Sequence, residues 1–599
     1  MYNVSTAYKS DIKNVFRNPS YIEVDFSITD ADANADSYVT DNGHTVYSVS
    51  DGLISDAITE VEERYATFEK NNFVLDGTSK ILPASSPYEY QGFVGNTLSG
   101  IDTVFSTTPI ITIEFLTEYF DLAGLTMKFD TVKGDFPTSL TIIAYNDLTE
   151  VYNTTFTPTS SNSNVFVSSG GIPDCNLIEI IANNSNLPYR RFKVEEVFLG
   201  LVKRFTGDDI ETCTWKKESD FINSKLPKVT FDFTVLDVDR EYDPENPTGI
   251  YPYIEKQQPV SFRLGYELDT GVIEYVKCGD YVTSGDITID SNNSIPRVTF
   301  KTISLIGYMT DIYRQGVYSS GGRSLYDLAE DILTYSGLPL DGVNNMWILD
   351  SSLSSLYSKA PLPELDCRSL LQLIANAGMC ILDVDRNGYI TIKPKVNTDV
   401  GFTMKLNDDY VIPTFKNYPT LQGVDTYEND IKIATVISEL GVYEVSGASS
   451  TTYEVSYDSA SNISASAGAG LTIVGTPSYF SRMCRIVLTG TGTLTLSGYK
   501  LIINKMVVSS EFNLTGERCP VENILLTNKA HTIAFANWIG AVVDRKNEYT
   551  IENRGFPELD IGDRMLMDTL YTTDYPVDIL SSEITFNGAI KGTTKVLGV

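Results

Sequence analysis

The sequence is poor in the side chains on which most hydrolytic and metal sites depend. Its 599 residues include two histidines, His44 in the turn-like DNGHT and His531. They make neither the HExxH motif of zinc peptidases nor a recognisable Ser-His-Asp arrangement, and no GxSxG motif is present. The seven cysteines are scattered and form no CxxC pair, so the sequence indicates neither a zinc site nor a disulfide framework. We therefore expect no catalytic residue, no metal site and no cofactor, with the cysteines as free and mostly buried thiols.

Basic side chains are also scarce relative to acidic ones. The chain has 45 Lys and Arg against 78 Asp and Glu, a net charge of −33, which opposes binding to nucleic acid or to anionic membranes. The N-terminal MYNVSTAYKSDIKN lacks the apolar core of a signal peptide, and no apolar run reaches the ~18 residues of a membrane span. We expect a protein that folds in a reducing cytoplasm, without a membrane span or a conventional secretion signal.

Strand patterns dominate what is present. Short segments rich in β-branched and aromatic residues are bounded by Gly, Pro, Asn or Asp, for example TIEFLTEYF, KVTFDFTVLDV, PVSFRLGYEL and YITIKPK. The length is enough for roughly four domains of ordinary size. The pattern predicts a β-rich α+β protein with several domains.

Three helices are marked. RSLYDLAEDILTYSGLP keeps its apolar residues on one face, with Ser324 as the cap and Gly337 at the end. CRSLLQLIANAGM carries a capping box, Ser369 with Gln372, and Gly378 at the position of a left-handed C-terminal residue. The third helix is predicted over about 528–545.

Two stretches differ from the rest in composition. From about 99 to 202, strand-like segments alternate with polar loops, which predicts a self-contained β-sandwich inserted into a longer domain. From about 446 to 470, Ser, Thr, Gly and Ala predominate, which predicts a mobile loop or a β excursion.

Acidic clusters offer two candidates for cation binding. Asp383-Val384-Asp385-Arg386-Asn387-Gly388 opens like a calcium loop, but Pro394 stands where the bidentate glutamate belongs, so a hairpin turn is the favoured interpretation. DVDREYDPENP, from Asp237, is interpreted as a solvated acidic loop. A carboxylate pair acting on a glycosidic bond stays open, because 78 acidic residues always supply pairs.

Four stretches in order along the chain carry a family resemblance. They are YATFEKNNFVLDGTSKILP (65–83), the segment from VFLGLVKRF to SFRLGYEL (197–268), SLLQLIANAGMCILDVDRNGYITIKPK (369–395) and RGFPELDIGDR (554–564). Together they resemble the baseplate hub or tail-associated (tail tip) proteins of tailed bacteriophages, of the type found with Gram-positive hosts. In that arrangement RYATFEKNNFVLDG (64–77) is a structural link into the inserted module.

The resemblance implies a structural virion protein with no enzymatic activity of its own, assembled in the bacterial host cytoplasm. Three copies would form a ring at the tail tip, with the tail tube and distal tail protein above and a spike or fibres below. The lumen would hold the tape-measure protein, and DNA would pass only as cargo. Three copies would carry three times 33 negative charges, which would repel the phosphate backbone.

The inserted stretch resembles a galactose-binding-like (discoidin-type) β-sandwich. The likeness lies in an early strand at 111–115, a strand at 140–147 that ends AYND, and a closing strand within 187–200. Modules of this type often bind sugars through loops at one end. The candidate contact residues are Tyr145, Tyr152, Tyr189 and Arg190. Glycan binding at the host surface and a purely structural spacer both remain open.

The predicted division is 1–95 and 203–322 as one hub β-domain, 96–202 as the inserted sandwich, 323–395 as a small α/β domain, and 396–599 as a C-terminal β-rich hub domain. A glycan-binding surface protein and a carbohydrate-active enzyme are the alternatives in function. A contractile bacteriocin particle would use the same kind of hub.

Overall fold

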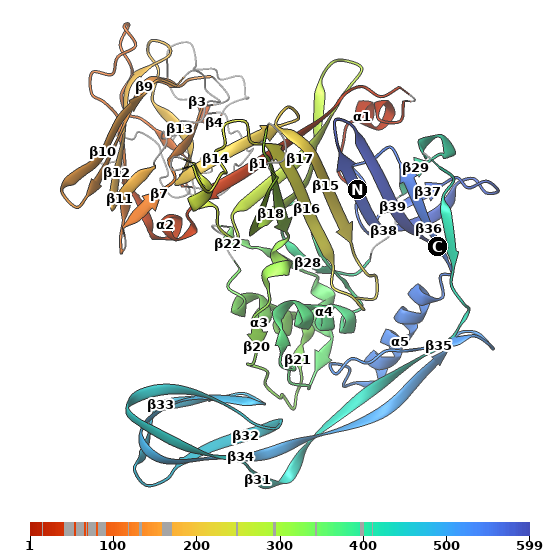
Figure 1. The fold of residues 1–599 in the computed structure, drawn as a ribbon. Helices are drawn as coiled ribbons and strands as arrows, with labels where there is room; N and C mark the ends of the chain where they lie inside the picture. Colours follow the sequence, from red (N-terminus) through yellow and green to blue (C-terminus); the bar gives the residue numbers. More distant parts are fainter. Residues whose placement is uncertain are drawn as a thin grey trace.

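β-Strands are the predominant secondary structure of the protein. The computed structural model describes residues 1–14, 16–40, 53–54, 65–66, 69, 80–81, 92–117, 119–130, 134–158, 171–246, 249–290, 295–338, 340–341, 344–395, 400–409 and 411–599. Within these residues a large central sheet carries a lateral β module, a small helical domain and a long β-arm (Figure 1). The predicted fold class, a β-rich α+β protein with several domains, is confirmed.

The central sheet has thirteen strands and joins segments from both ends of the chain. Its order is β14-β1-β17-β18-β19-β16-β15-β38-β39-β36-β30, with β37 beside β38 and β29 beside β37. The step from β15 to β38 places Trp215 opposite Ile584 and Cys213 opposite Phe586. This pairing fuses the regions 203–322 and 396–599 into one continuous sheet. The strands are β1 (Ser20–Thr29), β14 (Gly200–Thr206), β15 (Ile210–Glu218), β16 (Lys228–Leu236), β17 (Pro259–Glu267), β18 (Ile273–Asp290), β19 (Arg297–Ile303), β29 (Val400–Met404), β30 (Thr414–Asn417), β36 (Asn547–Asn553), β37 (Arg564–Met567), β38 (Tyr575–Phe586) and β39 (Ile590–Gly598).

Alternation of apolar and polar residues decides which face of this sheet is buried. In β16, KVTFDFTVL, every second side chain is buried, including Phe231 and Phe233. The Phe231 and Phe262 rings stack with centroids 3.8 Å apart, and Phe300 packs against Phe233. Such ring pairs stabilise a core by ~1 kcal/mol each beyond the area they bury.

The inserted module is a β-sandwich around one apolar core. A five-stranded sheet, β10-β9-β12-β6-β2, faces a three-stranded sheet, β5-β13-β8, with β7 and β11 at the side. The strands are β2 (Ser37–Thr40), β5 (Phe93–Val94), β6 (Ile110–Phe115), β7 (Phe120–Leu122), β8 (Thr126–Phe129), β9 (Pro137–Asn146), β10 (Thr149–Phe156), β11 (Ile172–Cys175), β12 (Leu177–Ser185) and β13 (Lys193–Phe198).

The module begins earlier in the chain than the predicted residue 96. Strand β2 pairs with β6, and Ala33 and Leu53 lie in the module core. Entry and exit are adjacent, because Thr29 of β1 lies opposite Gly200 of β14. Gly200 permits this approach, since a Cβ there would lie 2.1 Å from the Ile28 carbonyl oxygen. We therefore place the module at 30–199, an insertion at the turn of one hairpin.

The small helical domain follows the sequence prediction with two local differences. It contains α3 (Leu325–Tyr335) with Ser324 as its cap, α4 (Cys367–Ala377), and a sheet of β24 (Trp347–Leu349), β28 (Ile390–Lys393) and β27 (Ile381–Val384). The cap of α4 is Asp366 and not Ser369. The left-handed residue after α4 is Met379, with φ 56°, while Gly378 stays helical. Gly378 is needed for space, since a Cβ there would lie 2.4 Å from a Leu353 methyl.

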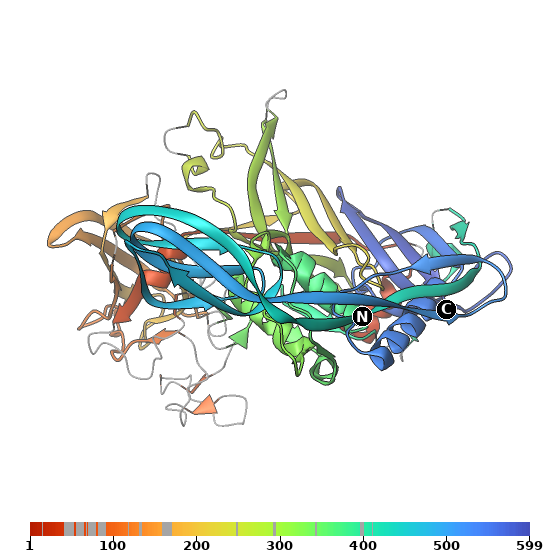
Figure 2. The same cartoon turned by 90° about the horizontal axis from the view of Figure 1, so that it is seen from below.

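A long antiparallel ribbon leaves the C-terminal half of the chain as an arm. Strand β31 (Leu421–Ser456) pairs with β34 (Met483–Glu511) along most of its length. Strands β32 (Ala460–Ala467) and β33 (Leu471–Tyr479) thicken the tip, and β35 (Glu517–Pro520) with α5 (Lys529–Val543) covers the root. Of the two predictions for 446–470, the β excursion is the one observed. Seen from below, the arm crosses beneath the small domain (Figure 2), where the Ser481 amide donates to the Gly316 carbonyl at 2.7 Å.

The remaining described elements are short. They are α1 (Thr6–Asp11), α2 (Ala31–Asp36), β3 (Tyr65–Ala66), β4 (Lys80–Ile81), β20 (Ile312–Tyr313), β21 (Arg323–Ser324), β22 (Leu340–Asp341), β23 (Asn344–Asn345), β25 (Tyr357–Ser358) and β26 (Leu365–Asp366), with single 3₁₀ turns at Tyr251–Tyr253, Leu305–Tyr308, Ser351–Ser355 and Leu406–Asp408.

Candidate functional site

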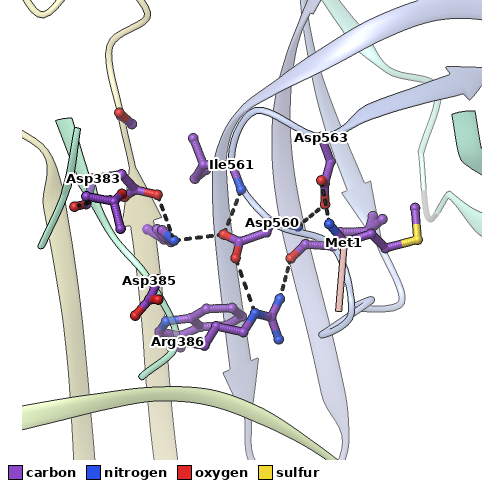
Figure 3. Close-up of polar contacts among 12 residues, drawn as sticks. Met1, Asp383, Asp385, Arg386, Asp560, Ile561 and Asp563 are labelled. Carbon is purple, nitrogen blue, oxygen red and sulfur yellow. Dashed lines mark hydrogen bonds and ion pairs between the residues drawn. The ribbon is translucent and has the colours of Figure 1, made fainter. Parts of the chain in front are cut away.

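A buried charge cluster joins the three parts of the hub body; we call Lys217, Asp383, Arg386 and Asp560 the junction cluster. Lys217 comes from β15. Asp383 and Arg386 come from the β27–β28 hairpin and Asp560 from the turn before β37 (Figure 3). The Lys217 amine lies 3.0 Å from an Asp383 carboxylate oxygen and 2.8 Å from an Asp560 oxygen. Two cations and two carboxylates make the cluster neutral, which lowers the cost of burying it.

Arg386 makes the largest number of contacts in the junction cluster. Its guanidinium lies 3.2 Å from Asp560 and donates to the backbone carbonyls of Lys277, Pro557 and Leu559 at 2.7 to 2.9 Å. It also lies over the Trp215 ring, 5.6 Å from the centroid. One side chain of the small domain thus fixes β18 and the segment before β37.

The electrostatics of the junction cluster follow from burial opposed by pairing. Burial acts to lower the pKa of Lys217, but Asp383 and Asp560 outweigh it and hold that pKa above its ordinary value. Burial acts to raise the pKa of Asp560, and Lys217 and Arg386 hold it well below the usual range. For Asp383, burial prevails and its pKa is raised. Lys217 and Asp560 therefore stay charged at neutral pH.

The chain N-terminus is tied to the same turn. The Met1 amine lies 2.5 Å from the Asp563 carboxylate, and the Asp560 amide donates to Asp563 at 2.8 Å (Figure 3).

Beside this turn, Glu558 is 1% exposed, and neither carboxylate oxygen has a hydrogen-bond partner among the described residues. Burial raises the pKa of Glu558 to about 7, although Arg17, Arg386 and Lys13 act against it.

The acidic motifs are turns. In Asp383-Val384-Asp385-Arg386-Asn387-Gly388, Asp385 accepts the amides of Asn387 and Tyr389 at 2.9 Å, and β27 and β28 flank the turn. The predicted hairpin is therefore confirmed. In DVDREYDPENP, Asp237 accepts the amides of Glu241 and Tyr242. Within the described ranges, no group of three or more His, Cys, Asp or Glu side chains could hold a metal ion.

The stretch 64–77 contributes a buried anchor to the module. Glu69 is 1% exposed and lies 2.8 Å from the amine of Lys193 on β13. Lys193 also contacts Asp130 and Asp135 at 3.0 and 2.8 Å, and these three carboxylates raise its pKa against the effect of burial. Apart from Tyr65, Ala66 and Glu69, the stretch lies outside the described residues. With the module placed at 30–199, this stretch lies inside the module instead of leading into it, and Glu69 ties it to β13.

The four residues considered for glycan contact do not form one group. Tyr145 and Tyr152 belong to the β9–β10 hairpin, at the end of β9 that faces Leu177. Tyr189 and Arg190 follow β12 at the opposite end, where Arg190 lies 3.1 Å from Asp135. The nine residue steps of β9 separate these ends by ~30 Å. A sugar site would have to use one end or the other.

The candidate nucleophiles and bases are poorly placed for catalysis. His531 lies in α5 with Nε2 2.7 Å from the Ala377 carbonyl oxygen, and burial lowers its pKa. His44 lies outside the described residues. The six buried cysteines and the half-buried Cys519 are free, and burial raises the pKa of each of the seven thiols.

In the part of the chain that the structure describes, no helix is long and apolar enough to cross a membrane.

The sequence alone does not single out Lys217, Asp560 or Glu558. Two signals were available: Lys217 occupies an inward position of the alternating strand TCTWKKE, and Glu558 lies between apolar residues in GFPELDIG. Neither signal identifies a partner, because the contacts join distant parts of the chain.

Comparison with known proteins gives structural likenesses only. No protein-family model matches the chain, and no curated protein matches it. The chain is similar to the prophage MuSo2 43 kDa tail protein from Shewanella oneidensis, with 10% identity over 66% of this chain and 95% of that chain and a TM-score of 0.37. It is similar to a tail protein from Neisseria meningitidis MC58, with 10% identity over 67% of this chain and 94% of that chain and a TM-score of 0.37. It is also similar to prophage tail protein gp18 from Listeria monocytogenes EGD-e, with 11% identity over 66% of this chain and 91% of that chain and a TM-score of 0.34.

Proposed function

We propose that this chain is a structural virion protein, the hub at the tip of a tail, which connects the tail tube and distal tail protein to a spike or fibres. The observation that carries the proposal is the central sheet, in which β15 and β38 fuse two β-domains that are far apart in sequence. A wall of this kind transmits force between the elements above and below it, because every strand is hydrogen-bonded to its neighbours. The four collinear sequence stretches add the family resemblance.

The junction cluster supports the same proposal. It fixes the small domain to both β-domains through Lys217, Arg386 and Asp560. Buried charges with several partners favour one relative placement of the parts that they join, since a shifted placement leaves a charge unpaired. A tail tip that closes a tube needs such a fixed geometry.

Three copies, a lumen that holds the tape-measure protein, and a virion location belong to this proposal. Loss of the chain from its parent particle should give heads without complete tails, and supplying the chain in trans should restore them. Arg386→Ala supplied in trans should restore them poorly, while Arg240→Ala, which removes an exposed arginine of the acidic loop DVDREYDPENP, should restore them fully. Complete, infectious tails formed without this chain would refute the proposal.

The module at 30–199 is proposed as an outward projection that contacts host surface glycans through one end. Its attachment to the hub sheet at Thr29 and Gly200 supports a projecting position (Figure 1). Binding of purified chain to host cell walls should be lost when the module is removed. If the chain without the module binds cell walls equally well, the module does not contact glycans and acts as a spacer.

A further inference from the structure

The inserted module buries one lysine among three carboxylates; we call Lys193, Glu69, Asp130 and Asp135 the lysine cluster. The Lys193 amine lies 2.8 Å from an oxygen of Glu69. It also lies 3.0 Å from Asp130 and 2.8 Å from Asp135. None of the four side chains is more than 10% exposed. Three buried carboxylates are more than an ordinary ion pair needs, because one of them already neutralises the ammonium.

The backbone holds the groups of the lysine cluster in place. Lys193 begins β13, which pairs with β8, and Asp130 directly follows β8. An antiparallel bridge joins Asp130 to Asp135. The Glu69 carboxylate also accepts the Arg191 amide, at 2.7 Å. The amine and the carboxyls therefore meet across neighbouring segments whose separation is fixed.

Asp135 is the carboxyl that is best placed to react with the amine. Its Oδ2 is the atom that lies 2.8 Å from the Lys193 amine, and its side chain is 2% exposed. Its Oδ1 lies 3.1 Å from the Nε of Arg190. Burial raises the pKa of Asp135, although Lys193 acts against this effect. The carbon of this carboxyl is electrophilic, because the guanidinium stabilises negative charge that develops on Oδ1.

We propose that Lys193 and Asp135 condense into an amide, an isopeptide bond that links β13 to the segment leading into β9. The bond forms between the lysine Nζ and the aspartate Cγ, and one water molecule leaves. The ammonium and the carboxylate contain all the atoms of the amide and the water, so the reaction needs no oxidant and no co-reactant. It removes two charges from the interior of the module, where their burial is costly. The bond does not depend on the proposed hub function.

The proton transfers balance within the lysine cluster. A proton passes from the Lys193 ammonium to Asp135 Oδ2, which gives a neutral amine and a neutral carboxyl. The amine lone pair attacks Cγ, and the electron pair of the C=O bond moves to Oδ1 beside Arg190. Glu69 takes a proton from the attacking nitrogen and gives it to Oδ2, the Cγ–Oδ2 bond breaks, and water leaves. Glu69 is ionised before and after the reaction, as a proton carrier must be.

Proximity and the exclusion of water favour the reaction at this site. Groups held in contact with the right orientation reach effective concentrations of ~10⁵ M or more. Water has little access to the buried cluster, so hydrolysis of the amide is slow. Lys217 of the junction cluster lacks these conditions, because its carboxylate partners Asp383 and Asp560 are 18% and 22% exposed.

Intact-mass spectrometry of the purified and denatured full chain tests the proposal. The wild-type mass should be lower than the mass of the sequence by one water molecule. Lys193→Arg keeps the charge but should not form the bond, and Glu69→Gln removes the proton carrier, so both variants should have the full mass of their sequences. Lys128→Arg is the matched control and should still lose one water, because Lys128 of β8 is also largely buried, 3.4 Å from Glu195, but lies outside the lysine cluster.

Peptide mapping identifies the bond. Trypsin does not cleave after an acylated lysine, so it should release residues 192–203 linked to residues 134–190. A link to residues 129–133 or 65–70 would place the bond at another carboxylate and overturn the assignment of Asp135. Loss of water by Glu69→Gln would overturn the role of Glu69 as the proton carrier.

The wild-type mass is decisive even if a variant fails to fold. A wild-type chain with the full mass of its sequence would show that the lysine cluster is an ordinary buried ion pair, and would overturn the proposal. A loss of water that persists in Lys193→Arg would overturn it as well, because the water would then come from another site.

Discussion

Replacing Glu558 with glutamine should stabilise the protein, and more at alkaline than at acidic pH. Glu558 is buried beneath the N-terminal segment, and the Tyr2 amide donates to its backbone carbonyl at 2.8 Å. The charged groups that face it are Lys13 and Arg17 from the N-terminal segment and Arg386 from the small domain. They do not offset burial, so the carboxyl holds its proton up to a pH of about 7.

The sign and size follow from the shift. The ordinary pKa of this carboxyl is 4.5 and the folded value is about 7, so the folded state binds the proton more tightly than the unfolded state. Stability from this group is complete below pH ~4.5 and is lost as the pH rises through 7, by ~3 kcal/mol in total. Glutamine does not titrate, so Glu558→Gln should gain ~2.5 kcal/mol relative to the wild type between pH 5 and pH 8.

The assay is urea unfolding followed by intrinsic fluorescence, with both proteins measured at pH 5 and at pH 8. Comparing the change with pH in the two proteins removes the contribution of every other titrating group. Glu552→Gln, at an exposed position of β36, is the control and should show no such change. An equal difference between variant and wild type at both pH values would refute the reasoning, as would a glutamine variant that is less stable at pH 8.

Three further outcomes follow from the same structure. Lys217→Met should destabilise the central body by ~4 kcal/mol in urea unfolding, because it leaves two buried carboxylates short of a partner, whereas Lys216→Met at a half-exposed position should cost less than ~1 kcal/mol. Removing 30–199 and joining Thr29 to Gly200 through an Asn-Gly turn should leave the rest folded by circular dichroism, and aggregation of that protein would show that the module is part of the hub core. Purified chain should release no sugar or peptide from host cell walls over hours, and turnover that vanishes on changing one buried carboxylate would reveal a glycosidase.

Local patterns predicted local structure well. The helix α3 has the predicted cap and buried face, and the hairpin of β27 and β28 turns at the predicted residues. Both depend on side chains within a few positions of each other, which periodicity and turn chemistry report directly. The cap of α4 was misassigned because Asp366 and Ser369 are both good capping residues, and the chain uses the first.

Features that depend on distant pairing could not be predicted. Strand β2, SYVT, is too short to indicate that it belongs to the module, and only its pairing with β6 shows this. Arg386 and Asp560 are 174 positions apart, and nothing in either local sequence specifies the other. The candidate sugar-binding residues were grouped by type, whereas β9 carries Tyr145 to one end of the module and leaves Tyr189 at the other.

A reconstruction of the parent particle tests the central claim most directly. We expect three copies of this chain at the tip of the tail tube, with the central sheet continuing the tube wall and the module at 30–199 projecting outward. Density for this chain away from the tail tip, or six copies of it within the tube, would show that the chain is not the hub.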